Sequence, residues 1–235
     1  MSVDQFIAQL RGCAATMNVA NPYNCYELGI DATPDVSHQR RLQLAAYLRH
    51  RLETAQIILV AEAPGYQGAR FSGLAMTSER LLSGSMNFVT EQDILGQVGL
   101  FERTSHINAS LYHAVRQRGF TEPTATVVWQ ELMATGQARN VALWNTFPFH
   151  PHRAANRLSN RTPNAAEIAA SADILVSLRA LFAQDCQLVA VGNIARDHLQ
   201  ELGVQATVLR HPANGGAADF RAQFRQLVGF ADQPN

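Results

Sequence analysis

Four short runs of apolar residues predict the strands of a buried sheet. They read IILVA at 57–61, VALW at 141–144, LVAV at 188–191 and ATVL at 206–209. Each run is continuous, whereas a strand with one solvated face alternates apolar and polar residues. Continuous runs of this length are typical of parallel strands covered on both faces. The pattern therefore predicts a central, mainly parallel sheet of four strands.

Helical patterns fall between these strands. An amphipathic stretch at 42–52 precedes the first strand, and Thr162 and Pro163 predict the N-cap and first residue of a long helix that runs to residue 181. Further helices are expected at 194–202, with a glycine C-cap behind it, and at 220–230. Alternating strands and helices indicate a three-layer α/β/α sandwich, which we expect to form one domain over residues 1–235. Residues 83–135 predict helices in an elaborated connection.

Polar or turn-forming residues follow each predicted strand. Residues 62–65 follow the first strand, Asn145 ends the second, residues 192–193 follow the third and His211 follows the fourth. An asparagine amide presents an acceptor and two donors to a planar ligand, and a histidine ring can donate a hydrogen bond to a developing anion. In open α/β sheets the ligand crevice lies beyond the carboxyl ends of the strands. We therefore expect these residues to converge on one site.

The composition excludes several classes of enzyme. The 235 residues carry 19 acidic and 19 basic side chains, and every basic one is arginine. Without lysine there is no P-loop lysine and no side-chain amine for a Schiff base or for pyridoxal phosphate. Three cysteines, at 13, 25 and 186, make neither a disulfide framework nor an iron–sulfur cluster. We expect a reduced, cytoplasmic protein without a signal peptide, membrane span or cofactor.

Charge is distributed unevenly, although the formal net charge is zero. No acid occurs between Glu131 and Glu167 or from 202 to 218. These stretches carry the basic residues Arg139, Arg153, Arg157, Arg161 and Arg210. A positive rim beside the strand ends favours a phosphate-bearing partner. His150 and His152 resemble half of a metal site, but no carboxylate ligand is near them in sequence, so we expect no metal.

Taken together, the strand-end motifs resemble the uracil-DNA glycosylase superfamily. AEAPG at 61–65 resembles the G-E-A-P-G turn of its iron–sulfur branch, and GLAM at 73–76 lies where the single-strand-selective branch has G-V-P-F. NTFP at 145–148, NRTP at 160–163 and EI at 167–168 are similar to T-N-x-V-K, N-R-x-P and E-I. HPA at 211–213 resembles the H-P-A motif. The resemblance extends from residue 57 to the C-terminus, but the cysteines that would hold a cluster are absent.

The resemblance implies a monofunctional DNA glycosylase that hydrolyses the N-glycosidic bond of uracil or a related deaminated base and leaves an abasic site. It implies that His211 donates a hydrogen bond to uracil O2 and that Asn145 reads the polar edge of the base. Ala63 stands where one branch has a water-activating Asp, which leaves Glu62 as the candidate for that role. Base contacts are expected from Ala63, Pro64, Gly65, Tyr66, Phe71 and Met76. DNA contacts are expected from Arg153, Arg157, Arg161, Arg210, Asn214 and Gly215.

Two other interpretations remain open. Ala63 and the lack of a bulky wedge residue in the loop at 214–217 are compatible with a non-catalytic nucleic-acid-binding protein of the same fold. The second interpretation is an unrelated α/β enzyme that binds a nucleotide or a small phosphorylated ligand at the strand edge. The expected partner in the leading interpretation is single- or double-stranded DNA with a damaged base, bound by a monomer.

Overall fold

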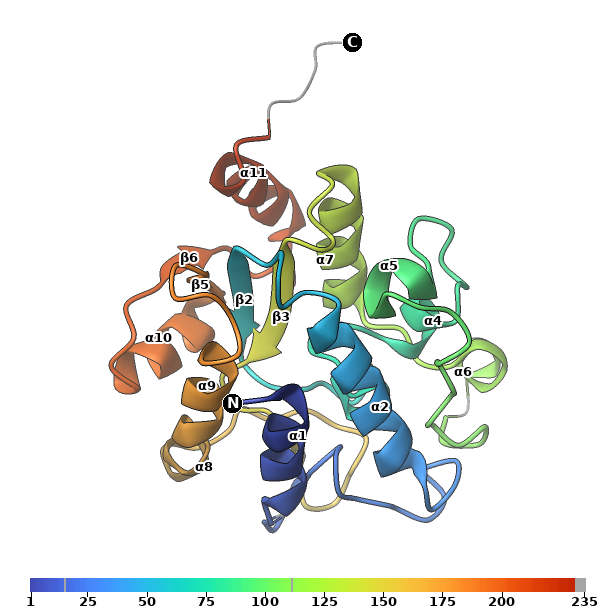
Figure 1. Cartoon of the computed structure of the whole chain (residues 1–235). Helices are drawn as coiled ribbons and strands as arrows, with labels where there is room; N and C mark the ends of the chain where they lie inside the picture. The colour runs from blue at the N-terminus through green and yellow to red at the C-terminus, as the bar shows by residue number, and fades with distance from the viewer. Residues whose placement is uncertain (15, 111, 231–235) are drawn as a thin grey trace.

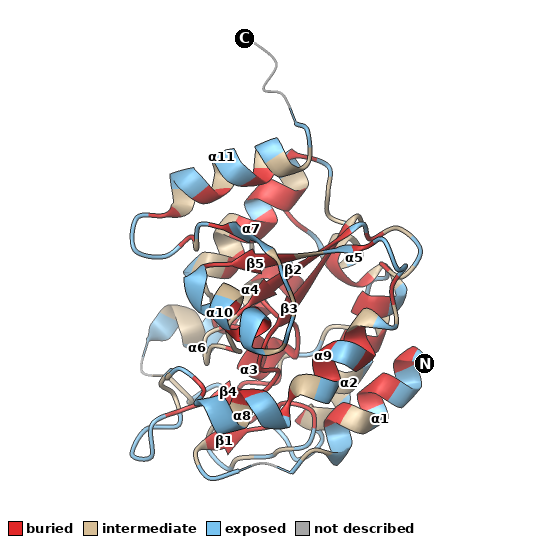
Figure 2. Ribbon diagram, turned by 90° about the vertical axis from the view of Figure 1, so that its left-hand side faces the viewer, coloured by how far each residue is buried: buried red, intermediate tan, exposed pale blue. Residues whose placement is uncertain are grey.

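The computed structural model describes residues 1–14, 16–110 and 112–230. Its main sheet has four strands in the order β3-β2-β5-β6, and every neighbouring pair is parallel. The strands are β2 (Ile57–Ala61), β3 (Val141–Asn145), β5 (Gln187–Val191) and β6 (Thr207–Leu209). This confirms the predicted sheet, because all four apolar runs form its strands. Figure 2 shows how strongly the buried residues concentrate in it.

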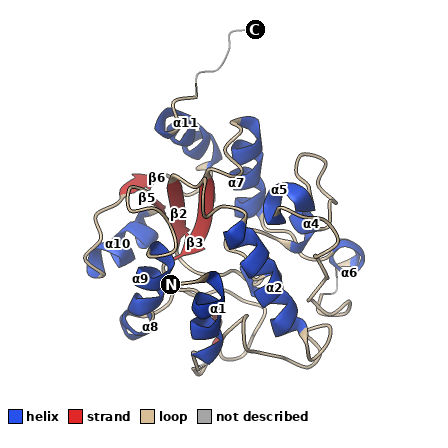
Figure 3. Cartoon of the chain, viewed as in Figure 1, coloured by secondary structure: helices blue, strands red, loops and turns tan. Residues whose placement is uncertain are grey.

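Helices cover both faces of the sheet, as expected for a three-layer sandwich (Figures 1 and 3). Figures 1 and 2 place α1 (Val3–Gly12), α2 (Val36–Arg49) and α9 (Ala172–Arg179) on one face. The opposite layer contains α7 (Pro123–Ala134), α10 (Asn193–Glu201) and α11 (Ala217–Leu227). Shorter helices are α3 (Ala69–Ser72), α4 (Glu79–Leu82), α5 (Glu91–Leu95), α6 (His113–Arg118) and α8 (Ala165–Ala170). No helix of the described residues is long and apolar enough to cross a bilayer.

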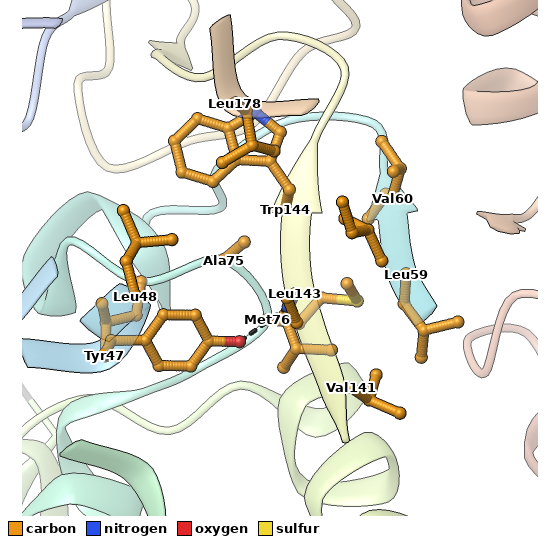
Figure 4. Close-up of a cluster of buried hydrophobic side chains, with 14 of the residues drawn as sticks. Tyr47, Leu48, Leu59, Val60, Ala75, Met76, Val141, Leu143, Trp144 and Leu178 are labelled. Atoms are coloured by element: carbon orange, nitrogen blue, oxygen red, sulfur yellow. Dashed lines mark hydrogen bonds between the residues drawn. The ribbon is translucent and has the colours of Figure 1, made fainter. Parts of the chain in front are cut away.

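Side chains of α2 and of the turn that follows it close the free edge of β3. The Leu143 N–H donates to the Tyr47 hydroxyl at 2.6 Å, as the dashed line in Figure 4 marks. The Arg51 guanidinium donates to the Val141 carbonyl at 3.1 Å and to four further backbone carbonyls. An edge strand otherwise offers unpaired backbone groups to other chains. Arg51 is completely buried and pairs with no carboxylate of the described residues. Five backbone carbonyls accept its hydrogen bonds instead.

A buried carboxylate organises the irregular segment between α4 and α7. Glu79 accepts hydrogen bonds from the N–H groups of Thr104, Ser105 and Phe120 at 2.9–3.1 Å and from the Ser105 hydroxyl at 2.6 Å. A single side chain thus satisfies backbone donors that a regular element would pair. This is why the segment can be fixed although the short helices α5 and α6 are its only helices before α7 among the described residues.

A two-stranded antiparallel sheet joins the N-terminal region to the loop after β3. It consists of β1 (Val19–Ala20) and β4 (His150–Pro151), with Val19 opposite Pro151. The His152 N–H also donates to the Asn18 carbonyl at 2.9 Å. Residues 18–20 are therefore fixed to a loop that lies more than a hundred residues further along the chain.

Several predicted helix limits were wrong. The long helix expected from Thr162 to residue 181 begins after Asn164, whose side chain forms a capping box with Glu167, and it is divided at Ser171 into α8 and α9. Asn164 displaces Thr162 as N-cap because its side chain accepts from the Glu167 N–H while the Glu167 carboxylate accepts from the Asn164 N–H. The helices expected at 42–52 and 220–230 begin and end earlier, at 36–49 and 217–227.

Three fully buried charges lie together between α2, α3 and the loop before α2. Asp31 accepts hydrogen bonds from Arg40 at 2.5 Å and from both terminal nitrogens of Arg70 at 3.0 and 3.1 Å. Burial would raise the pKa of Asp31, but the guanidinium groups of Arg70 and Arg40 outweigh it and lower that pKa. Glu27 adds a second carboxylate 3.6 Å from Arg70. This cluster holds α3, and with it the chain that follows the 62–65 turn.

Candidate active site

A pocket of about 410 Å³ lies at the carboxyl edge of the sheet. The ends of β2, β3 and β6 all contribute to its wall, as the sequence pattern predicted. It also receives side chains from the start of α7 and from the loop before α8. Its lining consists of Ala61, Glu62, Ala63, Pro64, Gly65, Met76, Glu122, Thr124, Asn145, Asn160, Arg161, Thr162, His211 and Ala213.

Hydrogen bonds between two strand-end turns hold one side of this pocket. The Thr146 and Phe147 N–H groups donate to the Ala61 and Glu62 carbonyls at 2.8 and 3.0 Å. The Thr146 hydroxyl also donates to the Glu62 carbonyl at 2.8 Å. Consequently the 62–65 turn and Asn145 are fixed relative to each other, which a site that reads a rigid ligand needs.

His211 has a defined tautomer. Its Nδ1 atom accepts a hydrogen bond from the Ala213 N–H at 3.1 Å, so the proton of the neutral ring is on Nε2. Burial, together with the neighbouring Arg210, lowers the pKa of His211 and favours the neutral ring. Gly192 has φ +89°, and a methyl group there would lie 3.0 Å from the His211 Cβ. The glycine therefore gives the ring its space and leaves one N–H donor beside the pocket.

Asn145 ends β3 and is buried, with 4% of its surface exposed. Its side-chain amide forms no hydrogen bond with any described residue, although it lines the pocket. The amide therefore retains one acceptor and two donors for a ligand. An amide that lines a pocket and has no partner among the described residues is available to a ligand or to water, which marks this position as a binding group.

Glu62 lies between the pocket and a second cavity of about 330 Å³. His211 and Ala213 also line both spaces, and Arg210 and Asn214 line the second. The Glu62 backbone carbonyl accepts hydrogen bonds from Thr146 and Phe147, whereas the Glu62 carboxylate forms no hydrogen bond with any described residue.

The structure changes the expected base-stacking residues. Met76 lines the pocket in the left-handed backbone region, with φ +46°, and belongs to the apolar cluster of Figure 4. Phe71 was expected as an alternative stacking residue, but it is completely buried and stacks on Phe120 with ring centroids 4.8 Å apart. Tyr66 also packs on Phe120, edge to face, and is not part of the lining. The prediction that Phe71 and Tyr66 contact the base is therefore corrected.

Arg161 was expected to contact DNA, but its guanidinium is fully engaged within the protein. It donates twice to Glu167, at 2.6 and 2.8 Å, and once each to the carbonyls of His152, Thr162 and Asn18. A guanidinium has five N–H donors, and these bonds use all of them. Arg161 therefore fixes the pocket wall to the N-terminal region and has no donor left for a phosphate.

The other basic candidates differ in their freedom. Arg153 and Arg210 are exposed, and their side chains form no ion pair with any described residue. Arg157 is exposed but lies 3.4 Å from Glu27. Asn214 and Gly215 form an exposed turn with φ +54° and +79° behind His211. Arg153 and Arg210 are thus the cations best placed to meet a charged partner.

Glu122 and Asn160 line the pocket, although sequence reasoning did not select them. The Asn160 side-chain oxygen accepts from the Tyr66 N–H at 3.0 Å and so holds the end of the 62–65 turn. Burial raises the pKa of Glu122 to about 7. Asn160 belongs to the NRTP motif, so the sequence contained a signal that could have identified it. Glu122 immediately precedes α7 and belongs to no motif, so the sequence contained no such signal for it.

Gly68 leaves space for another part of the protein. A methyl group there would lie 2.0 Å from Oε2 of Glu122. Gly73 similarly faces Arg40.

The histidine pair near β4 has a structural role. His150 is completely buried, and its Nε2 atom lies 2.9 Å from the Ser159 carbonyl. Burial, with Arg70 nearby, lowers the pKa of His150 to about 3. Within residues 1–14, 16–110 and 112–230, no group of three His, Cys, Asp or Glu side chains is arranged to hold a metal ion.

No family model and no curated protein matches this chain. Among solved structures it is similar to the crystal structure of wild-type SMUG2 from Pedobacter heparinus. The two chains share 14% identity and superimpose with a TM-score of 0.59, over 97% of this chain and 98% of that one. The likeness shows that the two chains share a fold. Because it covers 97% of this chain, it extends beyond the part that carried the motifs of the resemblance.

Proposed function

We propose that this protein is a monofunctional DNA glycosylase that hydrolyses the N-glycosidic bond of uracil or a related deaminated base and leaves an abasic site. The observation that carries the proposal is the presence, in the lining of one pocket, of an Asn145 amide without a partner among the described residues and of a neutral His211 that has its proton on Nε2. Such a pair can read the edge of a base and stabilise the anion that it becomes.

The chemistry follows from what the bond cleavage requires. An extruded nucleotide places its base in the pocket, at a cost of a few kcal/mol for unstacking. When the glycosidic bond breaks, its electron pair stays on the base, and the sugar becomes positively charged. A fixed N–H donor aimed at the developing anion stabilises this state without reorganisation. His211 supplies the donor, and Asn145 holds the amide edge by which uracil differs from cytosine.

The absence of lysine supports the monofunctional character. A glycosylase that also cuts the strand needs an amine to form a Schiff base with the sugar. The chain offers no lysine for this step. Water is then the nucleophile, and the product is an intact strand with an abasic site.

A panel of lesions tests the proposal. Oligonucleotides with uracil, hypoxanthine or xanthine, single-stranded and duplex, are incubated with the protein and analysed for free base and for alkali-sensitive sites. We expect base release from at least one substrate, with strand breaks only after alkali. If a control glycosylase processes the panel and this protein releases nothing, the proposal is wrong. Salt-dependent DNA binding without base release would instead favour the non-catalytic interpretation.

Removing the two free cations at the rim should weaken DNA binding in a salt-dependent way. Each phosphate contact contributes about 0.7 to the slope of log K against log salt for single-stranded DNA, so R153Q/R210Q should reduce that slope by about 1.4. The variant R49Q is the control, because Arg49 ends α2 just before β2 begins and so lies at the opposite edge of the sheet. An unchanged slope in the double variant would exclude these residues from the DNA contact.

A further inference from the structure

The pocket contains a carboxyl group that the strand-end motifs do not account for. Glu122 immediately precedes α7, lines the pocket, and its side chain forms no hydrogen bond or ion pair with any described residue. Its Oε2 atom is buried without a partner. Most buried polar atoms in proteins have a partner, so an exception in a cavity wall indicates a group held for a ligand or for water.

The chain opposite this carboxyl group is built to make room for it. A methyl group on Gly65 would lie 3.6 Å from Oε1, and one on Gly68 would lie 2.0 Å from Oε2. The 62–65 turn thus passes directly beside the carboxylate. Position 63 of this turn is alanine and supplies no carboxylate. Glu62 is the only acidic residue of the turn.

We infer that Glu122 is the general base that accepts a proton from the water attacking the sugar, an inference that rests on the proposed glycosylase function. In this step the water oxygen bonds to C1′ and the C1′–N bond breaks. The electron pair of the broken bond leaves with the base, which His211 stabilises. The water proton moves to the Glu122 carboxylate, which later releases it to solvent.

The electrostatic surroundings suit this role. A general base works best when its pKa lies near the working pH, and burial raises the pKa of Glu122 to about 7. The other titratable or charged side chains that line the pocket are Glu62, Arg161 and His211. None of them pairs with Glu122, and Arg161 is engaged with Glu167. Burial, together with Arg210, lowers the pKa of His211 and favours its neutral form.

The test is the pH dependence of single-turnover base release, measured on whichever lesion oligonucleotide the wild-type protein cleaves. The wild-type rate should rise with pH and level off, with a midpoint near pH 7, because the ionised carboxylate is the active form. E122Q should be about 100-fold slower at pH 8, and its rate should not rise through this range. E62Q should retain the wild-type midpoint.

Two further measurements separate catalysis from folding and binding. E122Q should bind the same oligonucleotide within threefold of wild type and melt at a similar temperature, since the carboxyl group forms no hydrogen bond or ion pair with a described residue that the amide would break. The inference is overturned if E122Q cleaves at the wild-type rate, if it is slower but keeps the midpoint near pH 7, or if E62Q loses that midpoint instead. A wild-type rate that falls as pH rises through 7 also overturns it. Absence of base release by the wild-type protein would overturn the proposed function itself.

Discussion

Replacing His211 with alanine should slow base release by about 10²- to 10³-fold, the usual cost of removing one preorganised donor from an anion site. The reason is geometric as well as electrostatic. The Ala213 N–H fixes the ring through Nδ1, so Nε2 presents its proton in a single orientation. Single-turnover rates of wild type and H211A on the same oligonucleotide measure the effect.

A matched histidine on the surface serves as the control. His113 is exposed at the start of α6 and does not line the pocket, so H113A should cleave at the wild-type rate. H211A should remain folded, because the ring accepts only one backbone hydrogen bond. A folded H211A protein with full activity would show that the anion is bound elsewhere.

The largest effect on stability is expected from D31N. This change removes the negative charge that compensates two fully buried guanidinium groups, Arg40 and Arg70. Breaking a buried ion pair by removing one partner typically costs about 3–5 kcal/mol, because an uncompensated charge stays behind. The free energy of unfolding in urea, extrapolated to water, should fall by this amount.

An exposed pair shows whether burial is the cause. Asp4 and Arg49 are as close as Asp31 and Arg40, at 2.5 Å, but their side chains are 76% and 53% exposed. D4N should therefore change stability by less than about 1 kcal/mol. Equal effects of D4N and D31N would contradict the assignment.

The pH dependence of this contribution has a definite sign. Because the folded protein lowers the pKa of Asp31, the charged cluster stabilises the fold at every pH above the ordinary pKa of an aspartate. The contribution disappears only as the pH falls through the lowered pKa, in strongly acidic solution. Urea unfolding of wild type and D31N should therefore converge there.

The sheet was predictable because its signal is local. Four continuous apolar runs gave four strands, and the residues that follow them met at one edge as the rule for parallel sheets requires. Helix limits were less accurate because the capping box of Asn164 and Glu167 was not distinguished from the alternative cap at Thr162. Choosing between two caps depends on side-chain geometry that spacing alone does not contain.

The errors at the site have a different cause. The Phe71 prediction failed because the ring found an aromatic partner, Phe120, that lies 49 positions away in the chain. Arg161 was expected to be free for DNA because one of its acceptors, the Asn18 carbonyl, is far away in the sequence and could not be foreseen. Glu122 was missed because nothing near it in sequence marks it as unpartnered. Whether a polar side chain is free for a ligand depends on distant residues, so it appears only in three dimensions.

At two positions arginine makes contacts that lysine could not make. Arg51 serves five carbonyl acceptors and Arg161 uses five donors, whereas an ammonium group has only three. Substituting lysine at either position would leave acceptors unpaired.

The strand order also has a consequence for synthesis on the ribosome. The first main strand to emerge, β2, lies in the interior of the sheet, and β6, the last, lies at its edge and delivers His211. A nascent chain translated as far as β5 already has Glu122 and Asn145 but lacks His211. Such a chain has no donor for a departing base, so under the proposed mechanism chemistry begins only once translation has supplied the final strand.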